Sequence, residues 1–272
     1  MNRFQRQFSR GLVALAAGAA AVCWLQAKFS RVLPDYDFLT GWVLLLAMLV
    51  LAVYNARKKL PFLPLGNSET WLQIHIYLGF FTVLLFLVHL DFRAPRGGFE
   101  ITLACLFLLV AASGVAGLLL SRILPRRLTA RGGEVIYENI PALRRACQSE
   151  AEALALGPEA KSPVIAGFYA RRLAGFFAGP ENFWQHLLES RRPLDARLAA
   201  LKDLGRAASE AERLALEKLG ALVRRKDGLD YHRALQLTLK TWLFVHLPLT
   251  YGLLIFTALH VLLVFGFSGG AR

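Results

Sequence analysis

Long apolar stretches alternate with charged segments along most of the chain. Five of these stretches approach the ~20 residues that a helix needs to cross a bilayer, and each is bounded by charged or turn-forming residues. They cover residues 11–27, 39–54, 71–90, 101–120 and 241–267. The pattern predicts an all-α membrane protein with five transmembrane helices.

The spans divide the chain into three parts. Residues 1–120 hold the first four predicted spans, residues 121–240 form an insertion of mixed charge, and residues 241–272 hold the fifth span and an outer tail. Helices are predicted in the insertion over 140–156, 164–177, 181–190 and 194–225, with a further break at Asp227–Gly228. The last of these helices has leucines on one face at helical spacing: Leu194, Leu198, Leu201 and Leu204. We expect a helical cytoplasmic domain that either caps the membrane helices or docks a soluble partner.

Composition and charge agree with a membrane protein. Hydrophobic residues make up 56% of the chain and charged residues 19%, and the mean hydropathy is +0.43. The net charge of +13 would suggest nucleic acid in a soluble protein, but the basic residues lie between apolar runs, so we expect lipid and no nucleic acid as a partner. Arg3, Arg6 and Arg10 precede the first span, which predicts an inner-membrane, multi-pass protein with its N-terminus inside and its C-terminus outside. The first span is expected to be a retained anchor rather than a cleaved signal peptide.

Four of the six histidines lie inside two predicted spans. His75 and His89 lie in the third span, and His246 and His260 lie in the fifth, each pair fourteen residues apart. Fourteen residues rise by about 21 Å and return to within about 40° of the starting direction, so both members of a pair share a helix face. Both spans are expected to run from inside to outside. The first members of the two pairs should therefore meet near the inner side of the membrane, and the second members near the outer side.

Two imidazoles that face each other inside a bilayer predict a haem site. Haem iron accepts two axial histidines and buries its macrocycle among apolar side chains, whereas a closed zinc or copper site would need further ligands. The three cysteines lie far apart and form no CxxCH for covalent haem attachment. We therefore expect two b haems, with the inner iron bound by His75 and His246 and the outer iron bound by His89 and His260.

Small and hydroxyl residues lie between the histidines on the same helix faces. Gly79, Thr82 and Thr257 are expected to contact haem, with helix packing as the alternative for the glycine and a bond to a preceding backbone carbonyl as the alternative for each threonine. Pro248 predicts a kink in the fifth span. Basic residues at the membrane edges would hold haem propionates, although topology alone also explains them: Lys58, Lys59, Arg122 or Lys240 inside, and Arg93 or Arg96 outside.

The other two histidines, His186 and His232, lie in the predicted insertion. His232 precedes His246 by fourteen residues, but the matching position of the third span, Pro61, offers no ligand. The neighbours of His232 are polar: Asp230, Tyr231 and Arg233. We therefore interpret His232 as a solvated surface residue.

The segments HIYLGFFTVLLFLVH at 75–89 and HLPLTYGLLIFTALH at 246–260, with one span between them, resemble the di-haem membrane cytochromes b. This superfamily includes respiratory cytochrome b and the ferric-reductase-like transmembrane domains. The resemblance implies a four-helix di-haem core formed from residue 39 onward, with the same histidine pairs. The chain has no GxGxxG, so a nicotinamide domain that would accept hydride is not expected. Pro180-Glu181 begins like the quinol motif of that family but lies in the insertion, and we treat it as a coincidence.

These observations predict an electron-transfer subunit of an oxidoreductase complex. It would carry electrons across the bilayer between the quinone pool and a periplasmic or membrane redox subunit, with two b haems and a possible site for quinone. One alternative is a reductase for ferric chelates or another extracytoplasmic acceptor. A second alternative is a transporter or proton pathway that contains no haem and uses the histidines as a relay.

Overall fold

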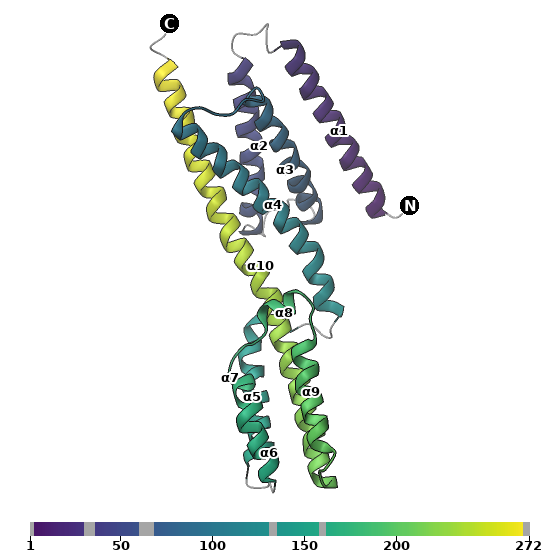
Figure 1. Ribbon diagram of the computed structural model, residues 1–272. Coiled ribbons are helices and arrows are strands. Elements are labelled where there is room, and N and C mark those ends of the chain that lie inside the picture. The colour runs from purple at the N-terminus through teal and green to yellow at the C-terminus, as the bar shows by residue number, and fades with distance from the viewer. Residues whose placement is uncertain (1–2, 30–35, 60–67, 131–134, 158–161, 269–272) are drawn as a thin grey trace. The chain divides into compact units, whose positions relative to one another are not determined.

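The computed structural model describes residues 3–29, 36–59, 68–130, 135–157 and 162–268, and the regular elements in these ranges are all helices. The chain divides into two compact units. The first unit comprises Met1–Leu118 and Leu243–Arg272, and the second comprises Leu119–Trp242. Two helices, α4 (Gly98–Ala130) and α10 (Glu210–Ser268), pass without interruption from one unit into the other (Figure 1). The predicted all-α class is confirmed.

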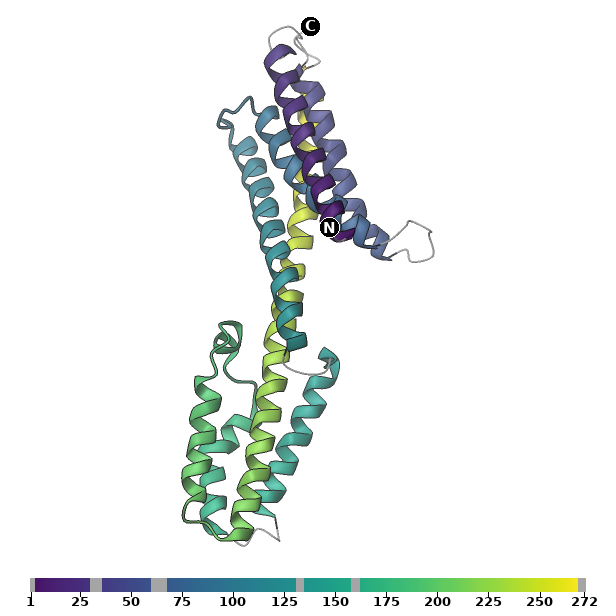
Figure 2. The ribbon, with the colours of Figure 1, turned by 90° about the vertical axis from the view of Figure 1, so that its right-hand side faces the viewer.

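The first unit contains α1 (Arg3–Phe29), α2 (Tyr36–Lys59), α3 (Ser68–His89) and parts of α4 and α10. Helix α3 lies against both α1 and α2, as the two views show (Figures 1 and 2). The core of the first unit is apolar and is formed by residues of α2, α3, α4 and α10: Leu44, Ala47, Met48, Leu85, Phe86, Ala104, Phe107 and Leu253. Gly11 and Gly18 of α1 bring that helix close to the rings of Tyr77 and Phe81 on α3.

Three helices in the described ranges are long and apolar enough to cross a membrane: Glu69–His89, Gly98–Ala130 and Glu210–Phe267. They contain the fourth and fifth predicted spans and the third as far as His89. The apolar parts of α1 and α2 are shorter, Leu15–Phe29 and Phe38–Tyr54. At 1.5 Å per residue they rise by about 22 to 26 Å, less than the ~30 Å of a bilayer core. Three candidate spans are therefore established, and the first two predicted spans remain a prediction.

The second unit is a helical bundle built on the first half of α10. It contains the single 3-10 turn η1 (Tyr137–Asn139), α5 (Ile140–Leu156), α6 (Pro163–Phe168), the π-helical turn η2 (Tyr169–Leu173), α7 (Ala174–Ala178), α8 (Phe183–Leu187) and α9 (Arg192–Gly205). One buried cluster joins α5, the α6–α7 segment, α9 and α10, and includes Cys147, Tyr169, Phe176, Leu201 and Val223. The helix predicted over 140–156 is confirmed, as is the leucine face of α9, which packs on this cluster.

Two predicted helix boundaries in this unit are wrong. The single helix predicted over 194–225 is two helices, because Ser209 and Glu212 cap the start of α10: the Glu212 carboxylate accepts the Ser209 N–H at 2.8 Å, and Ser209 Oγ accepts the Glu212 N–H at 3.4 Å. The predicted break at Asp227–Gly228 does not occur, and α10 continues through it. A helical glycine costs about 1 kcal/mol, and buried neighbours such as Val223 and Leu229 offset that cost.

The helix predicted over 181–190 is shorter than expected. Helix α8 covers Phe183–Leu187, because Asn182 and Glu189 at its two ends adopt left-handed φ angles of 58° and 56°. The segment predicted over 164–177 is helical throughout, but η2 interrupts its α-helical hydrogen bonding with one π turn. Pro248 lies inside α10, which is continuous on both sides of it.

Candidate functional site

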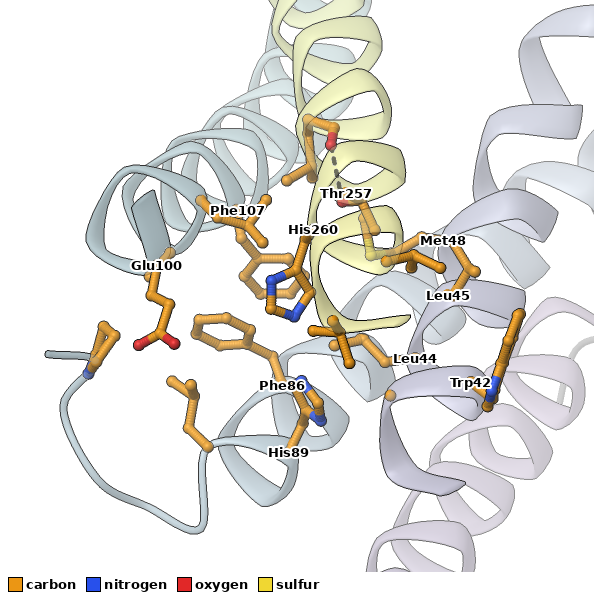
Figure 3. A pocket seen from close by; sticks show the side chains of 18 of the residues that line it. Trp42, Leu44, Leu45, Met48, Phe86, His89, Glu100, Phe107, Thr257 and His260 are labelled. Carbon is orange, nitrogen blue, oxygen red and sulfur yellow. Dashed lines mark hydrogen bonds between the residues drawn. The ribbon is translucent and has the colours of Figure 1, made fainter. Parts of the chain in front are cut away.

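The predicted outer histidine pair, His89 and His260, lines one cavity of the first unit. His89 at the end of α3 and His260 on α10 both face a space of about 560 Å³, within the range of small-molecule and cofactor sites. Figure 3 shows the two imidazoles directed into this space from their separate helices. The remaining wall is largely apolar and comes from α2, α4 and α10: Leu44, Met48, Ala104, Phe107, Leu253 and Val264. An apolar cavity with two imidazoles fits a planar, mostly apolar metal cofactor.

The His89 imidazole is held against α2. Its Nδ1 atom lies 3.3 Å from the hydroxyl of the buried Thr40. A Cβ atom at Gly41 would lie 3.1 Å from Cε1 of the same ring, so a larger residue there would require the ring to shift by a few tenths of an ångström. Because Nδ1 contacts the hydroxyl, Nε2 is the nitrogen that would bind a metal.

The ring of Phe99 packs against His260, the second histidine of the cavity. The ring of Phe99 on α4 stacks on it with 6.3 Å between centroids and 13° between planes. Phe99 also stacks on Phe256, one turn before His260 on α10. These contacts fix the orientation of the His260 ring from the side of α4.

The inner histidines lie at the other end of the same helix faces. Nδ1 of His246 lies 2.7 Å from the hydroxyl of Ser113 on α4, and a Cβ atom at Gly114 would lie 3.9 Å from Cε1 of this ring. His75 on α3 packs against Tyr54 of α2, with 4.9 Å between ring centroids. Each imidazole of the inner pair thus has one polar or aromatic neighbour, and the imidazoles of the outer pair share a cavity.

The predicted contact residues between the histidines have defined roles. Thr82 and Thr257 are buried, and their hydroxyls donate to the preceding carbonyls of Gly79 at 2.7 Å and Leu253 at 2.8 Å. The alternative of a backbone bond is therefore the observed one. Thr257 also lines the outer cavity. Gly79 has open space before it, since a Cβ atom there would meet nothing within 4 Å, and helix packing in the described ranges does not require a glycine.

Charged residues line the α3–α4 end of the outer cavity. Arg93, Arg96 and Glu100 all contribute to its wall. Arg93 pairs with Asp91 at 3.2 Å, and both side chains are largely exposed. The two expected outer propionate partners thus lie at the cavity. Of the expected inner partners, Lys240 pairs with Glu138 at 2.7 Å, and the side chains of Lys58 and Lys59 lie outside the described residues.

The interpretation of His232 as a solvated residue is wrong. His186 and His232 are 3% and 5% exposed. The polar sequence around His232 is misleading because Asp230 is buried as the partner of Arg144 and Lys226. Glu181, part of the Pro-Glu dipeptide, forms an ion pair with Arg197.

Thr40, Ser113, Tyr54 and Phe99, which contact the four imidazoles, were missed by sequence reasoning. The two hydroxyl residues lie in predicted spans, where polar side chains are rare, and this signal could have found them. Among the described residues no group of three or more His, Cys, Asp and Glu side chains could hold a metal ion. A haem iron takes only two protein imidazoles, so a haem site would not form a group of three such side chains. No family model, curated protein or solved structure matches the chain.

Proposed function

We propose that this protein is a membrane-embedded di-haem b-type cytochrome that carries electrons across the bilayer. The single observation that carries the proposal is the cavity of about 560 Å³ lined by His89 and His260 from two helices. Bound haem supplies a one-electron carrier whose potential depends on its ligands and surroundings. The chain supplies the axial imidazoles, an apolar wall that limits water, and guanidinium groups of Arg93 and Arg96 for the propionates.

The inner pair completes the path in this proposal. His75 and His246 would bind the second haem, about 21 Å from the outer level by helix rise. Each haem would be held by two imidazoles of the chain, and in that arrangement it would supply one-electron transfer rather than a binding position for a substrate. Five spans, an inner N-terminus and an outer C-terminus belong to the same proposal.

Membrane quinol is the proposed electron donor. An open groove of about 510 Å³ lies between α1 and α3 and combines apolar residues with the polar Thr70, Gln73 and Tyr77. His75 lies on α3 between these polar residues in sequence, which supports a headgroup site near the inner pair. Reduction of the haems by a soluble quinol, slowed in Gln73→Leu and unchanged in Thr102→Ala, would support this donor. Equal rates in wild type and Gln73→Leu would remove the groove from the proposal.

Absorbance spectroscopy tests the haem assignment. The detergent-purified protein, reduced with dithionite, should show b-type bands and two haems per chain. His75→Ala and His260→Ala should each lose one haem, whereas His186→Ala, the same substitution in the second unit, should keep both. A colourless wild-type protein, produced with haem available, would refute the proposal and favour transport or proton transfer.

A reductase for an external acceptor is the second candidate. The exposed side chains of Arg93 and Arg96 line the outer cavity, and their positive charge suits an anionic chelate. Reduction of ferric citrate by the pre-reduced protein alone, lost in an Arg93→Gln/Arg96→Gln variant that keeps both haems, would favour this function. Haem oxidation only after addition of a partner protein would favour the electron carrier.

A further inference from the structure

Each histidine pair contains one imidazole held by a hydroxyl and one packed against an aromatic ring. In the outer pair, Thr40 contacts His89 and Phe99 stacks on His260. The inner pair repeats the arrangement, with Ser113 beside His246 and Tyr54 beside His75. The two hydroxyls come from α2 and α4, which carry none of the four histidines.

The contacts of the Ser113 hydroxyl favour one tautomer of His246. Ser113 Oγ donates its single proton to the Val110 carbonyl at 2.8 Å and lies 2.7 Å from His246 Nδ1. A hydroxyl has one proton to give, so the His246 tautomer that satisfies both contacts is the one whose Nδ1–H donates to Ser113. This tautomer carries the lone pair on Nε2, the form that binds iron.

We propose that Ser113 and Thr40 are positioning residues: each accepts an Nδ1–H···O bond from its histidine, orients one ligand of a haem and lowers the reduction potential of that haem. The proposal rests on the proposed haem function. An N–H···O bond raises the basicity of the imidazole, which favours ferric over ferrous iron. Loss of the bond should therefore raise the potential of that haem alone. A shift of about fivefold in the ferrous-to-ferric ratio at fixed potential corresponds to about 40 mV for one electron.

Spectroelectrochemical titration of the full chain tests this inference. Ser113→Ala should raise the potential of the inner haem, the one lost in His75→Ala, and Thr40→Ala should raise that of the outer haem. Ser113→Thr and Thr40→Ser, which keep a hydroxyl, should restore each value. Thr102→Ala is the control, because the Thr102 hydroxyl donates to the Gly98 carbonyl, on an exposed turn of α4.

The outcomes separate the two levels of the proposal. Both haems present at unchanged potentials in Ser113→Ala and Thr40→Ala would overturn the positioning role and leave the haem function in place. Loss of one haem in the alanine variant with retention in the hydroxyl variant would support it. A wild-type protein that binds no haem would refute the proposed function itself.

A separate surface of the second unit carries an independent inference. Trp184 on α8 and the following Leu188 are 70% and 80% exposed, although both are large and apolar. The opposite side of α8 is packed: Phe183 and Leu187 contact the cluster of Leu124, Tyr231 and Leu235. Arg127 fixes this position by donating from its guanidinium to the Leu187 carbonyl at 2.8 Å.

The surroundings of Trp184 favour lipid as its partner. Leu120 and Leu124, which lie in the same packed region, continue the apolar run of the candidate span Gly98–Ala130. Exposed arginines are close in sequence to Leu124 on α4 and to Leu188 after α8: Arg122, Arg126, Arg191 and Arg192. An exposed tryptophan beside arginines at the end of a span is typical of the interface with anionic lipid headgroups.

We infer that Trp184 and Leu188 insert into the headgroup region of an anionic bilayer. In a Cys23→Ala/Cys105→Ala protein, a polarity-sensitive fluorophore on Leu188→Cys should be quenched by brominated lipid and shift to the blue in phosphatidylglycerol vesicles. Leu214→Cys is the matched control. Leu214 is 56% exposed, and it lies about 42 Å along α10 from Trp242, the last residue of the second unit before the predicted fifth span. Arg191→Gln/Arg192→Gln should weaken the quenching. Equal quenching at both positions, or none at Leu188→Cys, would overturn the inference and point to a protein partner.

Discussion

Replacement of Asp230 by Asn would disrupt a buried ion cluster in the second unit. The carboxylate accepts hydrogen bonds from the Lys226 ammonium and the Glu181 N–H, and it lies 3.1 Å from Arg144 Nε. The side chains of Lys226 and Asp230 are 0% and 1% exposed. The variant leaves two cations facing a neutral amide. Removing one partner of a buried pair costs about 3–5 kcal/mol, so we expect the free energy of unfolding of this unit to fall by about that amount.

Alkylation of Cys147 measures this change. The thiol is fully buried, and burial raises its pKa, so labelling requires the second unit to open. In a Cys23→Ala/Cys105→Ala background, Cys147 is the one cysteine left of three. When opening and closing are fast compared with labelling, the labelling rate follows the open population. At 1.4 kcal/mol per factor of ten, Asp230→Asn should accelerate labelling roughly 100- to 4,000-fold.

An exposed ion pair provides the control. Asp203 lies 3.1 Å from Arg206, and their side chains are 62% and 77% exposed. Surface pairs contribute about 0–1 kcal/mol, so Asp203→Asn should change the labelling rate by less than about fivefold. Lys226→Met should have a smaller effect than Asp230→Asn, because Asp230 keeps Arg144 as a partner. A labelling rate for Asp230→Asn within fivefold of the parent would refute the reasoning.

Three further substitutions have defined outcomes. Gly41→Ala places Cβ 3.1 Å from His89 Cε1, so the ring must move, and the paramagnetic resonance signal of the outer ferric haem should shift at unchanged haem content. Gly79→Phe fills the open space on the face of α3 that carries His75 and His89, where haem would lie. Pyridine haemochrome analysis should therefore show one haem fewer, while the unfolding temperature stays within a few degrees. Tyr169→Phe removes a buried hydroxyl that lacks a hydrogen-bond partner among the described residues, so stability near pH 7 should be unchanged or higher by about 1 kcal/mol in urea denaturation. Burial raises the pKa of Tyr169 to about 12, so the wild-type chain should lose stability relative to this variant as the pH rises from 10 toward 12.

Helix periodicity made much of this fold predictable. The leucine face of α9 and the bounds of α5 follow from the spacing of apolar residues and from proline and glycine at the ends. The start of α10 was also predictable from the sequence, since Ser209 and Glu212 have the spacing of a capping box. It was missed because the leucine pattern continues on both sides of the cap.

Tertiary contacts decided the features that local sequence did not. Gly228 normally favours a helix end, but α10 continues because its neighbours on both sides are buried in the second unit. His232 lies in a polar sequence and is buried all the same, since Asp230 finds two cations on other turns and helices. Lys226 lies one helical turn before Asp230, at a spacing that the sequence shows, whereas Arg144 on α5 cannot be identified from the sequence around Asp230.

The candidate site likewise has features that local sequence predicts and features that depend on tertiary contacts. The placement of two histidines on one face fourteen residues apart is a property of a single helix, and the sequence predicts it directly. The neighbours of each imidazole depend on the register of α2 and α4 against the histidine helices, which involves residues far apart in the chain, such as Ser113 and His246. The same division should hold in function. Histidine substitutions should abolish the binding of one haem. Alanine at Ser113 or Thr40 should raise the potential of one haem or weaken its binding, and the matching hydroxyl variant should restore it.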